Sequence, residues 1–248
     1  MIAYFLAYNE IDLLPWQFKW CQNQGLEMFV IENQSTDGTK EFLIDNHIRH
    51  KTIDTSEAFD LRPLLLEMTR QIHTDKPDWF IYQGMDMFFV TSNISIKQLA
   101  AMANIMRYNM IALNQITFYH TSMQTAITPH KNPFTCNFHY RPNNIYTFIS
   151  AYSPEISIQP DKISRSNKSV FFDKHGCIFE MHAAKPIKNR VENLKRRERA
   201  WNNGLNKNYG RHYLDLAKRD FIYPETEQND IRDTRALYQL YSKLHILS

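Results

Sequence analysis

The stretch MIAYFLAYNEIDLLPWQFKWCQNQGLEMFVIENQSTDGT, residues 1–39, decides the fold class. Residues 1–7 read as a buried strand, and the apolar side chains of residues 11–25 recur at helical spacing. Residues 27–32 form a second apolar run, which ends in the polar turn 33–39. A strand, a helix and a strand in succession indicate that the chain opens as an α/β fold.

The same alternation continues through the first half of the chain. It predicts a parallel or mostly parallel sheet with helices on both faces. Further helices are expected at residues 37–46, 62–73 and 95–108, and further strands at residues 51–54, 79–82 and 110–120.

The periodicity then changes. Residues 116–160 are rich in Pro, His, Asn and Thr, show no clear period and predict a long irregular segment. Residues 169–182 return to strand-like alternation, and helical patterns follow at 187–201 and 237–244.

Composition narrows the class of protein. The chain has 248 residues, 43% hydrophobic and 22% charged, which suits one large α/β domain or a domain with appendages. No run of 18 apolar residues is present to span a bilayer, and the N-terminus lacks the pattern of a signal peptide. Three widely spaced cysteines, Cys21, Cys136 and Cys177, predict free thiols and a reducing compartment. We therefore expect a cytoplasmic protein.

One segment carries a marked excess of positive charge. Residues 185–219 contain eleven Lys and Arg residues against three Asp and Glu residues. The apolar stripe of the helix 187–201 is expected to face the protein body, with Lys188, Lys195, Arg196 and Arg199 outward. Such a face is either simply solvated or contacts an anionic acceptor carrier or the cytoplasmic face of a membrane. No nucleic-acid reading motif accompanies it, so nucleic acid is not an expected partner.

Polar side chains follow each predicted strand of the first half. Tyr8, Asn9 and Glu10 follow the first, Glu32 and Asn33 the second, Asp54, Asp60 and Arg62 the third, and Asp86 the fourth. In an open α/β sheet, ligands bind beyond the carboxyl ends of the strands, and such groups suit the base and ribose edges of a nucleotide.

Several of these residues also have a purely structural interpretation. Asn9 and Asp12 could cap the first helix, and Asp37 is expected to bond the backbone of its own turn. Asp86 differs because it is the single carboxylate in the turn of DWFIYQGMDMFFV, residues 78–90, after a strongly apolar strand. A ligand to a metal ion is the better explanation for such a residue.

These motifs resemble nucleotide-sugar glycosyltransferases with the GT-A fold, family two and its close relatives. The resemblance rests on AYNE at the first strand, the Trp-containing helix, the turn ENQSTDGT and, more weakly, GMDM at residues 84–87. Relatives commonly read Asp-x-Asp-Glu at that last place. Asp86 then matches the second Asp, whereas Gly84 replaces the first and Met87 replaces the Glu.

The resemblance implies a GT-A, Rossmann-like domain over residues 1–185 and a basic helical C-terminal extension, residues 186–248, packed on it. It implies sugar transfer from a nucleoside diphosphate sugar to a hydroxyl of a glycan or lipid-linked acceptor, in surface polysaccharide or glycan biosynthesis. The alternative is a catalytically degenerate protein that binds nucleotide sugars or glycans. The expected donor-binding residues are Tyr8, Asn9, Glu10, Glu32, Asn33, Arg62, Gly84 and Asp86.

The resemblance also assigns the chemistry. Asp86 and His182 are the expected ligands of a divalent metal, Mn²⁺ or Mg²⁺, which neutralises the leaving diphosphate. Glu180 and Asp161 are the expected catalytic carboxylates, with Glu155 and Asp173 as rivals for the base that deprotonates the acceptor.

Overall fold

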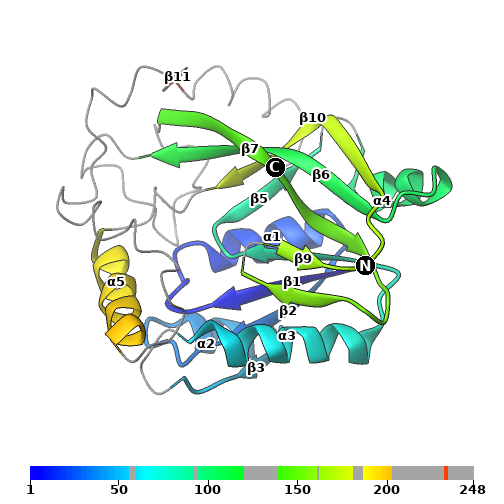
Figure 1. Cartoon of the computed structure of the whole chain (residues 1–248). Helices are drawn as coiled ribbons and strands as arrows, with labels where there is room; N and C mark the ends of the chain where they lie inside the picture. Colours follow the sequence, from blue (N-terminus) through cyan, green and yellow to red (C-terminus); the bar gives the residue numbers. More distant parts are fainter. Residues whose placement is uncertain are drawn as a thin grey trace.

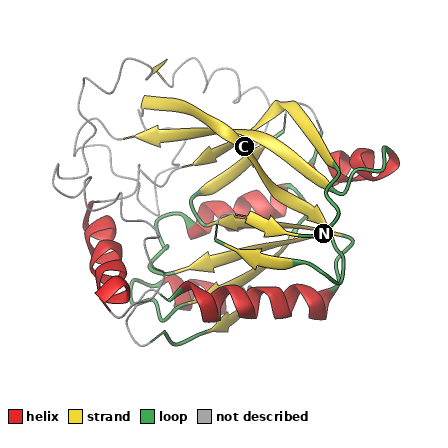
Figure 2. Ribbon diagram, viewed as in Figure 1, coloured by secondary structure: helices red, strands yellow, loops and turns green. Residues whose placement is uncertain are grey.

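The computed structural model describes residues 1–55, 60–91, 94–119, 139–160, 162–180, 187–202 and 232–233. These residues form a mixed α/β fold with a curled central sheet (Figures 1 and 2), and the expected fold class is confirmed. Within the described residues, no helix is both long and apolar enough to cross a membrane. The helical pattern at 237–244 lies outside them.

The N-terminal half builds a parallel layer. Its strands are β1 (Ile2–Ala7), β2 (Glu27–Glu32), β3 (Arg49–Thr52) and β4 (Trp79–Gly84), in the order β3-β2-β1-β4. Helices α1 (Leu14–Asn23), α2 (Thr39–Asp45) and α3 (Leu61–Asp75) connect them. The chain moves outward from β1 to β3 and then returns to the other side of β1, so the strand order reverses beside β1.

The rest of the sheet is largely antiparallel. Its strands are β5 (Met87–Val90), β6 (Met110–Tyr119), β7 (His139–Ala151) and β10 (Val170–Glu180), and the path runs β4-β7-β6-β10-β5. β7 is antiparallel to β4 and β6, whereas β10 is parallel to β6. Figure 1 shows β6 and β7 above the parallel layer. Because β5 follows β4 across the turn Met85–Asp86, the path curls back on itself.

Three short strands and two helices complete the described residues. β8 (Ser157–Gln159) and β9 (Lys162–Ser164) form a separate hairpin, and β11 (Arg232–Asp233) pairs with β7. Helix α4 (Ile96–Ile105) precedes β6, and α5 (Ile187–Asn202) follows β10.

The expectation of an irregular segment over 116–160 is wrong for part of its length. β7 is a long strand, although His139–Ala151 carries Pro142 and two asparagines that interrupt any alternation of apolar and polar residues. Its pairing with β6 also shifts register twice. Pairing with β4 and β6, rather than side-chain pattern, makes this segment a strand.

Aromatic side chains fill the centre of the core. Tyr4, Phe5, Phe80 and Phe88 are fully buried, and Trp20 of α1 donates through Nε1 to the carbonyl oxygen of Phe89 at 3.0 Å. Each such side chain contributes roughly 1.5–3 kcal/mol through burial. Cys21 and Cys177 are buried free thiols, as expected, while Cys136 lies outside the described residues.

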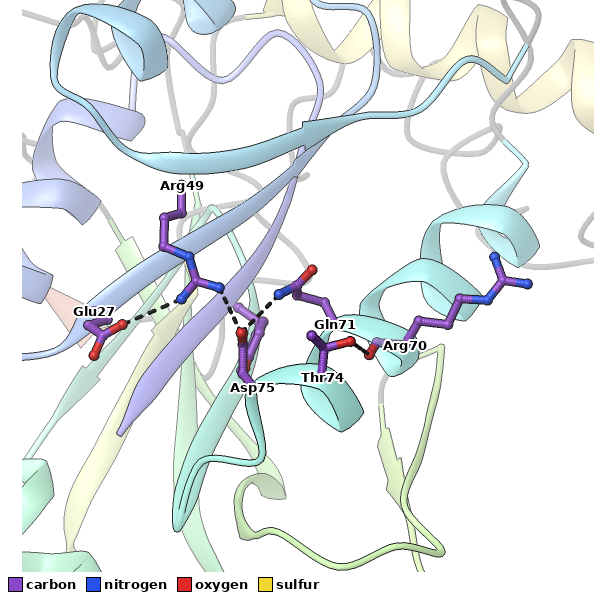
Figure 3. Close-up of polar contacts among 7 residues, drawn as sticks. Glu27, Arg49, Arg70, Gln71, Thr74 and Asp75 are labelled. Atoms are coloured by element: carbon purple, nitrogen blue, oxygen red, sulfur yellow. Dashed lines mark hydrogen bonds and ion pairs between the residues drawn. The ribbon is translucent and has the colours of Figure 1, made fainter.

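An ion-pair network ties the amino edge of the parallel layer together. Asp75, at the end of α3, accepts from Arg49 Nη2 at 2.7 Å and from Gln71 Nε2 at 3.0 Å (Figure 3). It also accepts from Tyr4 Oη at 2.8 Å. Arg49 also pairs with Glu27 at 3.4 Å. Burial would raise the pKa of Asp75, but the three donors outweigh it and hold that pKa below its usual value. The polar groups of this edge therefore stabilise the fold.

Candidate functional site

Four strands end together at the opposite edge of the sheet. β1, β2 and β4 are parallel, and the pairings through β7 and β6 give β10 the same direction. This edge therefore collects Tyr8–Glu10 after β1, Glu32–Asn33 at β2, Gly84–Asp86 at β4 and Glu180 at β10. It is also the edge at which the strand order reverses, where open α/β sheets bind their ligands.

The turn after β2 folds onto the residues after β1. The backbone N–H of Thr36 donates to Asn9 Oδ1 at 2.8 Å, and the N–H of Asn9 donates to Ser35 Oγ at 3.0 Å. The N–H of Glu10 donates to Thr39 Oγ1 at 2.8 Å. Asn9 adopts φ = 51°, a left-handed conformation that asparagine tolerates better than most residues. The two segments thus form one preorganised unit.

These contacts decide two of the structural alternatives. The side-chain oxygen of Asn9 accepts a hydrogen bond from the 33–39 turn. The N-cap residue of α1 is Leu13, and no side chain makes a capping hydrogen bond there. Asp37 is structural, as expected, because its carboxylate accepts from the N–H of Thr39 at 3.0 Å and from the N–H of Ile11 at 3.1 Å.

Helix α5 contributes a buried arginine to this edge. Arg196 is only 2% exposed, and its Cζ lies 3.3 Å from the centre of the Tyr8 ring. The Asn33 amide, in the orientation that satisfies its neighbours, accepts from Arg196 Nη2 at 2.8 Å and donates to the carbonyl oxygen of Ile53 at 3.0 Å. Figure 1 shows α5 beside the arrowhead of β1.

The expected orientation of the basic helix is therefore wrong for Arg196. Lys195 and Arg199 are exposed and Leu194 is buried, as the apolar stripe indicates. Arg196 instead turns inward, because the flat face of its guanidinium stacks on an aromatic ring, which offsets part of its desolvation. The side chain of Lys188 lies outside the described residues.

A second residue of α5 binds the same strand ends. Glu192, one helical turn before Arg196, accepts at Oε1 from Tyr8 Oη at 3.0 Å and from Asn9 Nδ2 at 3.1 Å. Burial and the bond to Glu192 raise the pKa of Tyr8, while the positive charge of Arg196 opposes them. The phenol therefore stays neutral and acts as a hydrogen-bond donor.

Several buried polar atoms at this edge have unused hydrogen-bonding capacity, among them one on Glu32 and one on Arg196. Glu32 is fully buried and accepts from the N–H of Ser35 through Oε1, but its Oε2 has no partner among the described residues. Arg196 Nη1 likewise has no partner there. Buried polar atoms are nearly always paired, so such atoms mark a place where a ligand is expected to bind.

A side chain of α1 holds the turn that carries Asp86. Gln17 is fully buried, and its Nε2 donates to the carbonyl oxygens of Met85 at 2.9 Å and Met87 at 2.6 Å. Asp86, between them, is 8% exposed. Gln17 therefore fixes the position and direction of the backbone at Asp86.

Gly84 leaves room for the carboxylate of Asp86. Its φ lies outside the left-handed region, so the backbone there does not itself require glycine. Instead, a Cβ atom at residue 84 would approach Asp86 Oδ1 to 2.5 Å. Glycine is required by the Asp86 carboxylate rather than by the turn.

Glu180 lies next to the Asp86 turn. It is half-buried at the end of β10, opposite Met87 in the antiparallel register with β5. Its Oε2 accepts from Gln115 Nε2 at 2.5 Å and from Thr117 Oγ1 at 2.6 Å, both on β6. These bonds fix the orientation of a carboxylate at the candidate site.

The remaining expected site residues are Arg62, Asp161 and His182. Arg62 lies in the first turn of α3, where its exposed side chain bonds Asp60 through Nε at 3.1 Å and Nη2 at 3.0 Å. Burial would raise the pKa of Asp60, but the bonds from Arg62 lower it. Asp161 and His182 lie outside the described residues. Within those residues, no group of three His, Cys, Asp or Glu side chains is arranged to hold a metal ion.

A hollow of about 690 Å³ lies at the other edge of the sheet, lined by Met1, Asp78, Trp79, Lys97 and Tyr152 among others. Trp79 begins β4, so this hollow opens at the amino ends of the strands. Open α/β sheets rarely bind ligands there, and the strand carboxyl ends remain the candidate site.

Comparisons with known proteins find only distant similarities to this chain. No protein-family model and no curated protein matches it. HddC from Yersinia pseudotuberculosis complexed with GMP-PN is 12% identical over 79% of this chain and 98% of that one, with a TM-score of 0.40. S. aureus TarS 1-349 in complex with UDP is 10% identical over 99% of this chain and 88% of that one, with a TM-score of 0.38.

A third solved structure resembles a smaller part of the chain. Glucosyl-3-phosphoglycerate synthase from Mycobacterium tuberculosis, in complex with Mn²⁺, UDP and glucosyl-3-phosphoglycerate, is 15% identical with a TM-score of 0.30. The match covers 48% of this chain and 44% of that one. The chain thus spans less than half of the length of this relative. Likenesses this distant establish neither a family nor an activity, and the argument for function rests on the site.

Proposed function

We propose that this protein is a glycosyltransferase that moves a sugar from a nucleoside diphosphate sugar to a hydroxyl group of a glycan or lipid-linked acceptor, in surface polysaccharide or glycan biosynthesis. The observation that carries the proposal is a pair of unpartnered buried atoms at the strand carboxyl ends: Glu32 Oε2 at the end of β2, and Nη1 of Arg196, whose guanidinium stacks on Tyr8. A nucleotide supplies a planar base for the ring, N–H groups for the carboxylate and phosphate oxygens for the guanidinium.

The donor would extend along the strand ends from β2 towards β4. Tyr8, Glu32 and Asn33 would hold the base and ribose, and the diphosphate would lie towards Gly84 and Asp86. The absence of a side chain at Gly84 lets the Asp86 carboxylate lie against the backbone of this turn, where the diphosphate is proposed to bind. Glu10 is buried beside Asn9, so its contribution is to the shape of this wall.

A divalent metal suits the chemistry of the Asp86 turn. A carboxylate is a preferred ligand of Mn²⁺ and Mg²⁺, and these ions keep several water or phosphate oxygens when they bind nucleotides. Asp86 would hold the ion, with His182 proposed as a second ligand. When bound, the metal would neutralise the charge that develops on the leaving diphosphate.

Glu180 is proposed as the base, with Asp161 as its rival. In a direct displacement, the carboxylate takes the proton of the acceptor hydroxyl as that oxygen bonds the anomeric carbon. The bond from this carbon to the diphosphate breaks, and the electron pair leaves with the diphosphate. Gln115 and Thr117 would keep the carboxylate aimed at the acceptor.

A screen of UDP- and GDP-linked sugars by thermal shift, with and without Mn²⁺, tests the proposal. A donor at 100 times its Kd stabilises the folded protein by about 2.7 kcal/mol. A stabilising donor should then release its nucleotide in the presence of a glycan acceptor. Binding without turnover would favour the catalytically degenerate alternative, and the absence of binding by every donor would overturn the proposal.

A further inference from the structure

Two residues of α5 occupy the side chains that the donor is proposed to use. Glu192 and Arg196, one helical turn apart, together engage Tyr8, Asn9 and Asn33. The edge of the sheet is therefore covered by a segment of the same chain.

The face of Tyr8 can hold only one stacked group. A distance of 3.3 Å from the guanidinium carbon to the ring centre is full van der Waals contact, which leaves no room for a base on that face. The guanidinium also resembles a base edge: it is planar, and it presents an N–H group to Asn33. Arg196 and a nucleobase stacked on that face would exclude each other.

The contacts that hold Arg196 leave part of its guanidinium unsatisfied. They are one hydrogen bond to a neutral amide, one ring face and the nearby charges of Glu192 and Glu32, and Nη1 has no hydrogen-bond partner among the described residues. Burial lowers the pKa of Arg196, as expected for a desolvated charge. A guanidinium gains much more from a phosphate, because its fork of N–H groups matches two phosphate oxygens. A nucleoside diphosphate therefore offers Arg196 a better hydrogen-bonding partner than the Asn33 amide.

We propose that Arg196 occupies the base position when no nucleotide is bound and moves to the diphosphate of the donor when the nucleotide binds. Arg196 is then both a gate for the base and a binding residue for the phosphates. This inference rests on the proposed function, because it requires a nucleotide at Tyr8. It predicts opposite effects of Arg196 on a nucleoside and on its diphosphate.

Isothermal titration separates the two effects. The Kd values of uridine and UDP, and of guanosine and GDP, are measured for the wild type and for Arg196→Ala. The variant should bind the matching nucleoside about threefold or more tightly. In the wild type, Arg196 covers Tyr8 and lowers the population of the binding-competent state, whereas the variant lacks this competitor. The advantage of the diphosphate over the nucleoside should fall about tenfold or more, because a charge-assisted bond is lost.

Two further variants make the test specific. Lys195→Ala removes the same charge from the exposed neighbour of Arg196 and should change neither affinity. Arg196→Lys keeps the charge but loses the flat face; it should also tighten nucleoside binding while it retains more of the diphosphate preference. It provides the answer if Arg196→Ala fails to fold.

The outcomes are distinguishable. Unchanged or weaker nucleoside binding by both Arg196 variants, with UDP or GDP still bound by the wild type, overturns the inference and leaves the proposed function standing. Failure of all four probes to bind either the wild type or the variants overturns the proposed function, and the inference with it.

Discussion

The carboxylate of Asp86 lies against Gly84, so that a Cβ atom at residue 84 would approach Asp86 Oδ1 to 2.5 Å. The turn therefore uses the missing side chain of one residue to accommodate the carboxylate of the other. Because the backbone at Gly84 avoids the left-handed region, a larger residue is excluded only by this contact.

Gly84→Ala should displace the Asp86 carboxylate without unfolding the protein. The neighbouring atom is the end of a side chain, which can rotate, so we expect a loss of stability of only about 0.5–1.5 kcal/mol from the forced rotamer. Donor binding in Mn²⁺ should weaken at the same time. Chemical denaturation and titration of the donor measure the two effects, and an unchanged donor affinity would place the diphosphate away from this turn.

Gly84→Asp should restore the usual pair of carboxylates of the resembling glycosyltransferases. The added charge favours a divalent ion, so we expect a lower Mn²⁺ concentration at half-maximal turnover if Asp86 can rotate away. Turnover measured against Mn²⁺ concentration checks this. Weaker metal dependence would mean that the two side chains cannot share the turn.

Asp86→Asn should remove most of the transfer activity and leave the fold intact. The amide keeps the shape of the side chain but loses the charge that would hold a metal against the leaving diphosphate. Loss of a group that stabilises transition-state charge costs about 10²–10³ in rate. Turnover at saturating donor measures the loss, with Asp45→Asn on the exposed end of α2 as the matched control. Near-normal turnover by Asp86→Asn would make Asp86 a turn residue only.

The sequence predicts the positions of the strands better than the contacts that the strands and helices make with one another. Apolar runs separated by helical periods predict β1, β2 and β4, and parallel order then brings Glu32, Asn33 and Asp86 to one edge. β7 was missed because pairing, rather than alternation, makes it a strand.

The two residues that most shape the site were missed for different reasons. Hydrophobic periodicity assigns Arg196, a charged residue, to the exposed face of its helix. Its stacking on Tyr8 depends on how α5 packs against the strand ends. Gln17 could have been found: it lies at helical spacing from Leu13, Leu14 and Trp20, so a polar side chain on a buried face was visible in the sequence.

Gln17→Leu should destabilise the protein and loosen the Asp86 turn. The carbonyl oxygens of Met85 and Met87 would lose the donor that now bonds both of them. An unsatisfied buried acceptor costs about 1–3 kcal/mol, so we expect a loss in that range and weaker donor binding. Gln22→Leu, on the exposed face of the same helix, is the control and should change the free energy of unfolding by less than about 0.5 kcal/mol. If Gln17→Leu and Gln22→Leu changed stability and donor binding equally, Gln17 would not be a positioning residue.

Asp75→Asn should lower stability at neutral pH and remove a pH-dependent contribution to stability. The carboxylate accepts from Tyr4, Arg49 and Gln71, and its pKa in the folded protein lies below the usual value of 3.8. A carboxylate with a lowered pKa stabilises the folded state fully above its unfolded pKa. That contribution is lost as the pH falls below about 4 and through the folded pKa.

The free energy of unfolding of the two proteins should therefore converge in acid. At pH 7 we expect Asp75→Asn to be less stable by about 1.5–3 kcal/mol, the usual contribution of hydrogen bonds to a charged group. Urea denaturation from pH 7 down to about pH 3 should show the difference shrinking below about pH 4, where the wild-type carboxylate begins to take up a proton. Asp78→Asn, at an exposed position, should show no such convergence. A difference that stays constant with pH would mean that the shape of the Asp75 side chain, and not its charge, stabilises the amino edge of the sheet.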